Sequence, residues 1–324
     1  MCSFKPPARS PSRPAASSPN GLLQTGPLAV ALGLPFDRDI WGNHAMSEET
    51  PAEQWNAASD GWARWAARAS DYLVPATEKM LNLAAVAAGS RVLDVGCGSG
   101  EQTVIAARRV GEAGHVLAID IAAPMVAAAE KNVASVGLRN VSTRVCPADA
   151  LSADMGPFDA AISRLVLMLV PVPVAAARAV LAVLRPGGAF SVIVPGDQAK
   201  AGFNAIVLDT RARHGGKTDW EDKPGSIRSL VNLGRLEAVL RDAGFTEVSV
   251  SSMPTVRRLE SASAATTMVR EGFAFFKALI ADLSQERQDA AWAEVEQTLK
   301  RFEGADGFAG PSEVNLVVGR KPTS

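Results

Sequence analysis

The sequence predicts an α/β fold: a seven-stranded, mostly parallel sheet flanked by helices, with an N-terminal helical cap and a helical insertion before the last strand. Short apolar runs alternate with helical patterns between residues 91 and 194, which is typical of a parallel sheet covered by helices. A glycine-rich turn, GCGSG at 96–100, directly follows the first of these runs. The 324 residues are 47% hydrophobic and 21% charged, the composition of a globular protein with a sizeable core.

The N-terminal segment, residues 1–48, is expected to be a disordered extension. It is rich in Pro, Ser and Ala and has neither helical nor strand periodicity. A targeting peptide is the alternative, although the prolines oppose an amphipathic presequence helix. A third possibility is that Met46 is the true start. The domain proper is then 49–324, with a core at 89–196 and a lid and helical insertion at 197–312.

The elements follow from the apolar periodicity of the chain. A helical pattern from Glu53 to Leu83, interrupted at Pro75, predicts the N-terminal cap. The polar stretch 196–226 has no clear period and is expected to be a lid. Strands are expected at 91–95, 115–119, 141–145, 159–165, 189–194, 247–251 and 313–318. Helices are expected at 104–110, 123–136, 174–184, 233–243 and 286–302.

Composition excludes several classes of function. With 33 basic and 34 acidic residues the net charge is -1, which gives no electrostatic footprint for nucleic acid and favours a small-molecule substrate. Three cysteines and three histidines without paired spacing suggest neither a disulfide framework nor a metal site. No apolar run reaches the roughly 20 residues of a membrane span. The expected location is therefore the cytoplasm, and the oligomeric state stays open.

The glycine loop indicates a nucleoside-type cofactor. Glycines in a turn between strand and helix let the backbone approach a ligand, and the following helix presents unpaired amides. A dinucleotide fingerprint needs Gly-x-Gly-x-x-Gly, whereas here Gly100 comes one residue early after Gly96 and Gly98. The first strand also ends in an acid, Asp94, where dehydrogenases usually have an apolar residue. The loop therefore argues against an NAD-dependent oxidoreductase.

Two further acids follow the next strands. Asp120 ends the second strand, at the separation expected of a carboxylate that accepts from both ribose hydroxyls. Its alternative role is a helix N-cap, and both roles are compatible in such a turn. Asp149 follows the third strand and could accept from an adenine amino group, but a loop or capping aspartate explains it equally well.

Together these residues resemble a known family. The stretches VLDVGCGSG (92–100), ID (119–120), ADA (148–150), FD (158–159) and LRPGG (184–188) have the order and spacing of class I S-adenosylmethionine methyltransferases, which share a Rossmann-like fold. More narrowly, SR (163–164) and LM (167–168) are similar to the group that includes ubiquinone and menaquinone C-methyltransferases. Relatives commonly have Asp-Pro after the fourth strand, and this chain has Val172 and Pro173 there, which puts the shape of that loop in doubt.

The resemblance implies S-adenosylmethionine as cofactor and a set of contacts to it. The glycine loop would surround the methionyl end, Asp120 the ribose, Ile121 and Met125 the adenine face, and Asp149 with Ala150 the adenine edge. Met125 could equally be ordinary helix core. Ser163 would lie near the methionyl group. The implied cofactor-binding residues are Asp94, Gly96, Cys97, Gly98, Ser99, Gly100, Thr103, Asp120, Ile121, Met125, Asp149, Ala150 and Ser163.

The acceptor is less well determined. Methyl transfer depends mainly on positioning and desolvation, so no base is compulsory and no catalytic residue is named. His214 is a possible base but is more simply a solvated loop residue, and Arg164 could fix an anionic substrate or pair with a site carboxylate. An apolar or aromatic acceptor is suggested by aromatic residues that could line a cap: Trp55, Trp62, Trp65, Phe203, Phe273, Phe275 and Phe276. The alternative to an enzyme is a non-catalytic cofactor-binding module.

Overall fold

A computed structural model describes most of the chain from residue 50 onward. The described residues are 50, 52–53, 55–56, 59, 65–66, 68, 70–197, 202–215, 225–272, 280–281 and 283–323. The extension predicted for 1–48 lies outside them. Trp62, Phe273, Phe275 and Phe276 of the predicted aromatic cap also lie outside the described residues.

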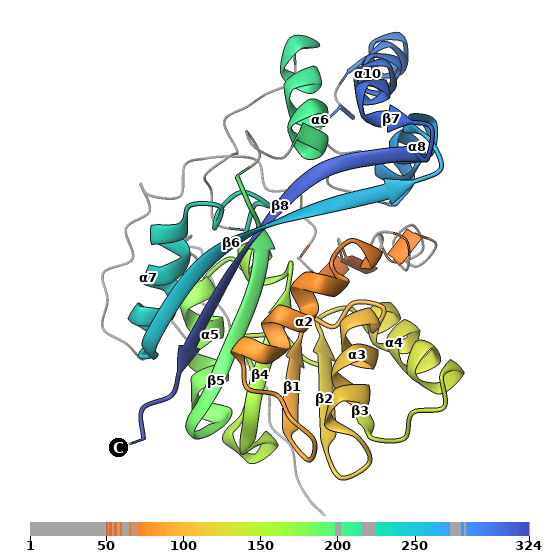
Figure 1. Ribbon diagram of the computed structural model, residues 1–324. Helices are drawn as coiled ribbons and strands as arrows, with labels where there is room; N and C mark the ends of the chain where they lie inside the picture. Colours follow the sequence, from red (N-terminus) through yellow and green to blue (C-terminus); the bar gives the residue numbers. More distant parts are fainter. Residues whose placement is uncertain are drawn as a thin grey trace, which may run out of the picture. The chain divides into compact units, whose positions relative to one another are not determined.

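A mostly parallel sheet forms the centre of the fold, as the sequence predicts (Figure 1). The strands run in the order β3-β2-β1-β4-β5-β8-β6, and a short β7 pairs with β8. Strands β1 to β5 are mutually parallel, whereas β8 is antiparallel to both β5 and β6. The bounds are β1 Arg91–Val95, β2 His115–Asp120, β3 Val141–Val145, β4 Phe158–Arg164, β5 Leu184–Pro195, β6 Thr246–Leu259, β7 Glu303–Gly304 and β8 Gly307–Arg320.

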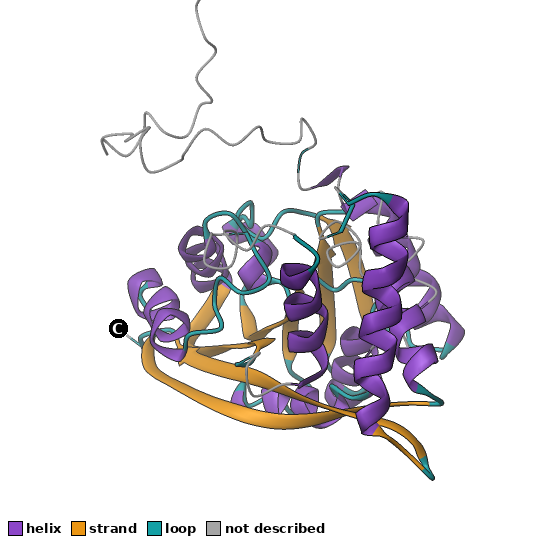
Figure 2. Cartoon of the chain, turned by 90° about the horizontal axis from the view of Figure 1, so that it is seen from above, coloured by secondary structure: helices purple, strands orange, loops and turns teal. Residues whose placement is uncertain are grey.

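Helices cover both faces of the sheet, which Figure 2 shows from above as a band of strands between helices. Alternation along β1 sends Leu93 into a core with α5 and α7, and Val92 into a second core with α2 and α3. Both side chains are fully buried, as expected for a parallel sheet. The helices are α2 Val74–Leu83, α3 Glu101–Val110, α4 Ala123–Ser135, α5 Pro173–Val183, α6 Gly202–Arg213, α7 Leu233–Ala243, α8 Ala262–Gly272 and α10 Gln285–Leu299.

Helix α7 matches the sequence prediction at both ends because local signals define it. The side chain of Asn232 accepts from the amide of Arg235 at the N-cap. Gly244 ends the helix in the left-handed conformation, with φ of 103°. In the rest of the core, β1 and β3 also match the predicted bounds, whereas β5 begins at Leu184, five residues before the predicted start at Ala189. Helix and strand ends carry weaker signals than their centres.

The last two long strands extend further than predicted. Pairing between β6 and β8 continues past the main sheet, from Thr255 opposite Ser312 to Leu259 opposite Phe308. The prolines and glycines of these segments weaken their strand pattern in the sequence. Pairing between the two strands stabilises the extended conformation despite this weak pattern. The paired ends of β6 and β8 lie next to the helices of the insertion (Figure 1).

The predicted lid is partly helical, which corrects the expectation of an irregular stretch. Within it, α6 forms because Phe203, Ile206 and Val207 share one helix face and pack into a cluster with α8 and α10. Residues 198–201 and 216–224 of that stretch lie outside the described residues. Among the helices that the structure describes, none has the length and apolar character needed to cross a membrane.

Candidate functional site

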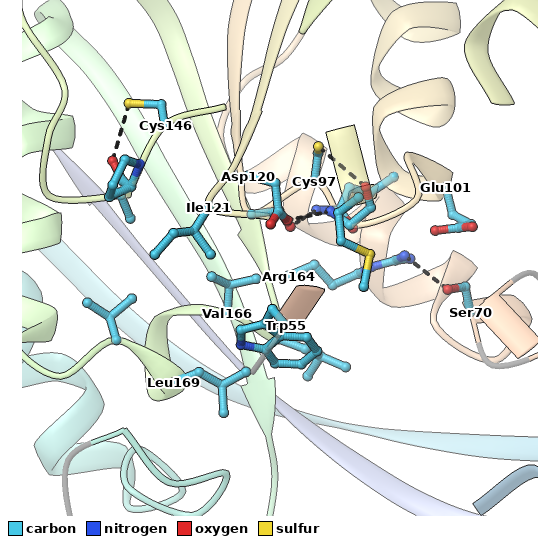
Figure 3. Close-up of a pocket in the computed structure, with 18 of the residues that line it drawn as sticks. Trp55, Ser70, Cys97, Glu101, Asp120, Ile121, Cys146, Arg164, Val166 and Leu169 are labelled. Atoms are coloured by element: carbon cyan, nitrogen blue, oxygen red, sulfur yellow. Dashed lines mark hydrogen bonds between the residues drawn. The ribbon is translucent and has the colours of Figure 1, made fainter. Parts of the chain in front are cut away.

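A pocket of about 290 Å³ lies at the carboxyl ends of the parallel strands, where open α/β sheets usually bind ligands (Figure 3). Its wall combines the loops after β1, β2, β3 and β4 with residues that precede α2. The lining residues are Trp55, Ser70, Tyr72, Leu73, Gly96, Cys97, Gly98, Glu101, Gln102, Asp120, Ile121, Met125, Cys146, Pro147, Ala148, Asp149, Arg164, Leu165, Val166, Leu169, Val170 and Pro171.

The glycine loop requires glycine for two different physical reasons. Gly96 has φ of 72°, and a Cβ built there would lie 2.3 Å from Cγ2 of Val166, so glycine allows the β4 loop to pack against the β1 loop. Gly100 has φ of 89° and approaches the Cα of Ala129 on α4, where an added Cβ would be only 3.0 Å away. Gly96 therefore shapes the pocket wall, and Gly100 packs two helices together.

Asp94 lies beneath the loop rather than in the pocket wall. It is fully buried, and its carboxylate accepts from Gln102 Nε2 at 2.8 Å and from Thr103 Oγ1 at 2.6 Å. Gln102 Nε2 also donates to the carbonyl of Gly96 at 3.3 Å. Burial raises the pKa of Asp94 to about 6, against the lowering effect of the two side-chain hydrogen bonds. The carboxylate thus ties the start of α3 to the loop.

Asp120 connects the glycine loop to the turn after β2. One carboxylate oxygen accepts from the amide of Gly98 at 2.9 Å, and the other accepts from the amide of Ala122 at 3.0 Å. Burial raises the pKa of Asp120, and the backbone amides act in the opposite direction. The N-cap of α4 is Ala122, so Asp120 is not the cap. Each oxygen keeps a further lone pair that can accept a ligand hydroxyl.

The structure distributes the other expected site residues between the wall and its support. Cys97, Ile121, Met125 and Asp149 line the pocket together with Gly96, Gly98 and Asp120. Four other expected residues lie outside the wall. The hydroxyl of Ser99 donates a hydrogen bond to Glu101, and that of Thr103 donates one to Asp94. The amide of Ala150 donates to the carbonyl of Pro147, and Ser163 is buried in β4. Strand alternation explains the last of these, because it turns Ser163 and Arg164 to opposite faces of the sheet.

Several wall residues were not expected from the sequence. Glu101 and Gln102 stand in the first turn of α3, where their place directly after the loop is a usable signal. Ser70 and Tyr72 come from the segment before α2, and no local motif marks them as pocket residues. Val166 comes from the loop after β4 and was unmarked in the same way.

The two basic residues considered as site residues, Arg164 and His214, have different surroundings. Arg164 lines the pocket and donates to Thr77 Oγ1 at 3.1 Å and Ser70 Oγ at 3.2 Å. Among the described residues, no carboxylate forms an ion pair with it. His214 lies outside the wall, at the end of α6, with Nε2 2.7 Å from Glu294 of α10. Phe203 also lies outside the wall, in the core of the helical insertion.

Comparison with known proteins identifies the domain. Residues 87–223 match a family model described as a methyltransferase domain. A nocamycin O-methyltransferase from Saccharothrix syringae is 36% identical over 126 residues, which are 39% of this chain and 45% of that protein. A ubiquinone biosynthesis O-methyltransferase from Xanthomonas axonopodis pv. citri is 32% identical over 51% of this chain and 66% of its own length. The chain thus spans about half to two thirds of these curated relatives.

A solved structure shows the same fold. A phosphoethanolamine N-methyltransferase 2 from Haemonchus contortus, solved with phosphomonomethylethanolamine and S-adenosylhomocysteine, covers 85% of this chain and 60% of its own, with a TM-score of 0.52 and 17% identity. The sheet, the glycine loop and the family match agree. The match assigns a methyltransferase domain to residues 87–223, the segment that contains β1 to β5 and the glycine loop.

Proposed function

We propose that this protein transfers the methyl group of S-adenosylmethionine to a small-molecule acceptor that is apolar or aromatic. The observation that carries the proposal is the division of one continuous pocket into two chemically different walls. Acidic and glycine-loop residues lie along one part, and a run of apolar side chains from the β4 loop lies along another.

The first wall suits the cofactor. Asp120 is already oriented by two backbone amides, so it can accept from ribose hydroxyls without reorganising. Met125 and Ile121 offer apolar surface for the adenine ring, and the exposed Asp149 offers an acceptor for its amino group. Gly96 and Gly98 have no side chains, so the path between these groups and Arg164 stays open.

The second wall suits an uncharged acceptor. The loop after β4 contributes Val166, Leu169, Val170 and Pro171 to the wall. Trp55 lies beside Val166 and Leu169 (Figure 3). Such a surface recognises apolar area and excludes water. The two curated relatives are named O-methyltransferases, which is compatible with a hydroxyl acceptor.

The chain contributes to the reaction mainly by positioning. When bound, S-adenosylmethionine supplies an activated methyl group, so the acceptor atom needs only an in-line approach and a route for its proton. The described wall contains no histidine. The apolar side chains would desolvate the acceptor, and the fixed loop would hold the donor against it.

Binding and turnover can be tested separately. Calorimetry should show micromolar binding of S-adenosylmethionine and S-adenosylhomocysteine, with no comparable binding of NAD. A methyl-transfer screen over phenols, quinols and amines should then give product with at least one apolar class. Binding of NAD alone would exclude the proposed cofactor role, and cofactor binding without turnover on any class would favour a non-catalytic module.

A pair of variants tests the acceptor wall. Leu169→Asp places a charge in the wall, whereas Val172→Asp changes a side chain that is 51% exposed and lies outside it. We expect Leu169→Asp to raise KM for an apolar acceptor about tenfold or more while leaving S-adenosylhomocysteine affinity unchanged. Val172→Asp should change neither quantity. Equal acceptor KM values in the two variants would argue against this wall as the acceptor site.

A further inference from the structure

Part of the pocket wall comes from residues that precede α2 and also contact the helical insertion. We define the cap segment as the described residues between Thr50 and Tyr72. It supplies Trp55, Ser70 and Tyr72 to the wall (Figure 3). A movement of the cap segment would therefore open one side of the pocket.

The cap segment presents two different faces where it approaches α2. Its residues Trp65, Ala66, Arg68, Ser70 and Asp71 are helical. At about 100° per residue, Ala66 and Ser70 lie within about 40° of each other, and both are buried. Trp65 and Arg68 lie about 60° apart on the other face, where Arg68 is exposed. One face thus packs inward, and the other is available for contacts with the insertion.

The second face carries the contacts between the cap segment and the insertion. Trp65 packs against the hydrophobic cluster of α6, α8 and α10, and its Nε1 donates to Glu271 Oε2 of α8 at 3.1 Å. Arg68 Nη1 lies 2.9 Å from Oε1 of Glu260, which stands between β6 and α8. Trp65 and Glu271 are 206 positions apart in the sequence, so these contacts form only in the folded chain.

The contacts of the second face can break without unfolding the domain. The side chains of Arg68 and Glu260 are 57% and 61% exposed, so water and salt screen their attraction. The hydrogen bond from the Trp65 indole is exposed as well. Leu73, by contrast, is buried in the core beside α2 and anchors the end of the cap segment. The cap segment therefore has one fixed end and one weakly held face.

We propose that Trp65 and Arg68 fasten the cap segment to the insertion and that release of their contacts opens the pocket to ligands. Both are positioning residues, because they act through Ser70 and Tyr72 of the wall. The turn at Tyr72 and Leu73 serves as the hinge. The inference concerns access to the pocket, so it goes beyond the proposed function and does not depend on which ligand binds.

The first test measures release of the cap segment without a ligand. Ser70→Cys places a thiol on the buried face of the cap segment, and its rate of alkylation by iodoacetamide, followed by mass spectrometry, reports how often this face becomes accessible. Ser191→Cys places a thiol in the fully buried part of β5 and reports unfolding of the sheet instead. Comparison of the two thiols separates local release from global unfolding.

Variants of the fastening residues should change the first rate alone. Arg68→Glu replaces an exposed attraction by a repulsion and should raise alkylation of the Ser70→Cys thiol about two- to fivefold. Trp65→Ala also removes packing against the insertion and should raise it about tenfold or more. Neither variant should speed alkylation of the Ser191→Cys thiol.

A charge exchange shows whether the ion pair itself is responsible. Glu260→Arg should act like Arg68→Glu, and the double variant Arg68→Glu/Glu260→Arg should return the rate close to that of the wild type, because the pair forms again with reversed polarity. Arg178→Glu is the matched control. Arg178 is an exposed arginine of α5 that donates to a backbone carbonyl, so its reversal changes the net charge equally and should leave the rate unchanged.

The second test measures ligand entry, with S-adenosylhomocysteine as the probe and stopped-flow fluorescence as the method. Arg68→Glu should raise the association and dissociation rates by a similar factor and leave Kd nearly unchanged, because more frequent opening speeds entry and exit alike. A purely structural role in the wall would instead raise Kd and the dissociation rate without faster association.

Each outcome decides the inference. Unchanged alkylation of the Ser70→Cys thiol in Arg68→Glu, or an equal rise at Ser191→Cys, would overturn it. A double variant that stays fast, or dissociation that accelerates without association, would overturn it as well. A wild type that binds no S-adenosylhomocysteine would overturn the proposed function, while the alkylation rates would still decide whether Trp65 and Arg68 fasten the cap segment.

Discussion

The guanidinium carbon of Arg257 lies 3.9 Å from the centroid of the Tyr72 ring. Arg257 belongs to the extended part of β6, and Tyr72 lines the pocket. The same guanidinium carbon lies 4.9 Å from the ring centroid of Phe203, in the core of the helical insertion. Arg257 therefore packs between the insertion and one wall of the pocket, in a geometry that stabilises both aromatic contacts.

Tyr72 is the only tyrosine of the chain, so 3-fluorotyrosine labelling should give one ¹⁹F resonance from the pocket wall. We expect this resonance to shift when S-adenosylhomocysteine is added, because the ligand would change the surroundings of the ring. Arg257→Leu should shift the resonance of the free protein, because the ring loses a stacked charge. Arg258→Leu is the matched control, since Arg258 is exposed on the same strand. An unchanged resonance at saturating ligand would place Tyr72 outside the binding site.

Gly96→Ala should destabilise the fold and weaken cofactor binding. The new Cβ would meet Val166 at 2.3 Å and would also force alanine to a φ of 72°. Gly137→Ala is a control for the backbone term alone, because Gly137 has φ of 73° with no atom within 4 Å of the added Cβ. We expect Gly137→Ala to cost about 1 kcal/mol in urea unfolding and Gly96→Ala to cost about 1–3 kcal/mol more. An equal loss of unfolding free energy in the two variants would show that the Val166 side chain moves aside without cost.

Asp94 should make stability depend on pH in an unusual direction. The pKa of Asp94 is about 6 in the folded protein and 3.8 for a free aspartate side chain, so between these values the folded state holds a proton that the unfolded state has lost. The contribution of this group to stability is thus fully present below about pH 4 and is lost as pH rises through about 6. The expected loss is roughly 3 kcal/mol at pH 7.

Asp94→Asn measures this contribution directly. The amide can accept from Gln102, and the Thr103 hydroxyl can rotate to accept from the new amide donor, so the local hydrogen bonds can be kept. The difference in free energy of unfolding, variant minus wild type, should increase between pH 4.5 and pH 7.5. Asp209→Asn, at an exposed position on α6, should show no such trend. A difference that stays constant with pH would contradict the raised pKa.

Asp120→Asn tests the ribose contact. A carboxamide has one acceptor oxygen, so it cannot serve the Gly98 and Ala122 amides and two ligand hydroxyls together. We expect about ten- to hundredfold weaker binding of S-adenosylhomocysteine, and a smaller loss for its 2′-deoxy analogue. Equal losses for the two ligands would mean that Asp120 acts only by fixing the loop. Thermal unfolding of the variant without ligand measures separately how much Asp120 stabilises the loop.

Sequence patterns were sufficient for the parallel core because local rules govern it. Strand β1, the glycine loop and Asp120 follow from apolar periodicity and turn chemistry within about thirty residues. Helix α7 was predicted at both ends because Asn232 is a local start signal and Gly244 a local stop signal. The same locality explains why Ile121, Met125 and Asp149, each in a loop or first turn after a strand, lie in the pocket wall.

Other features depend on contacts between distant segments, which no single stretch of sequence encodes. Ser70 and Tyr72 enter the wall only because α2 packs on the sheet, and Arg257 reaches Tyr72 only because β6 extends along β8. Whether Ser163 or Arg164 faces the pocket was decided by the one-residue alternation of β4 within the assembled sheet. Local patterns in the sequence were enough to predict the core of the fold and the acidic, glycine-rich part of the pocket wall. The cation and the apolar side chains that complete the pocket could be identified only in the folded chain, because burial and long-range packing set their positions.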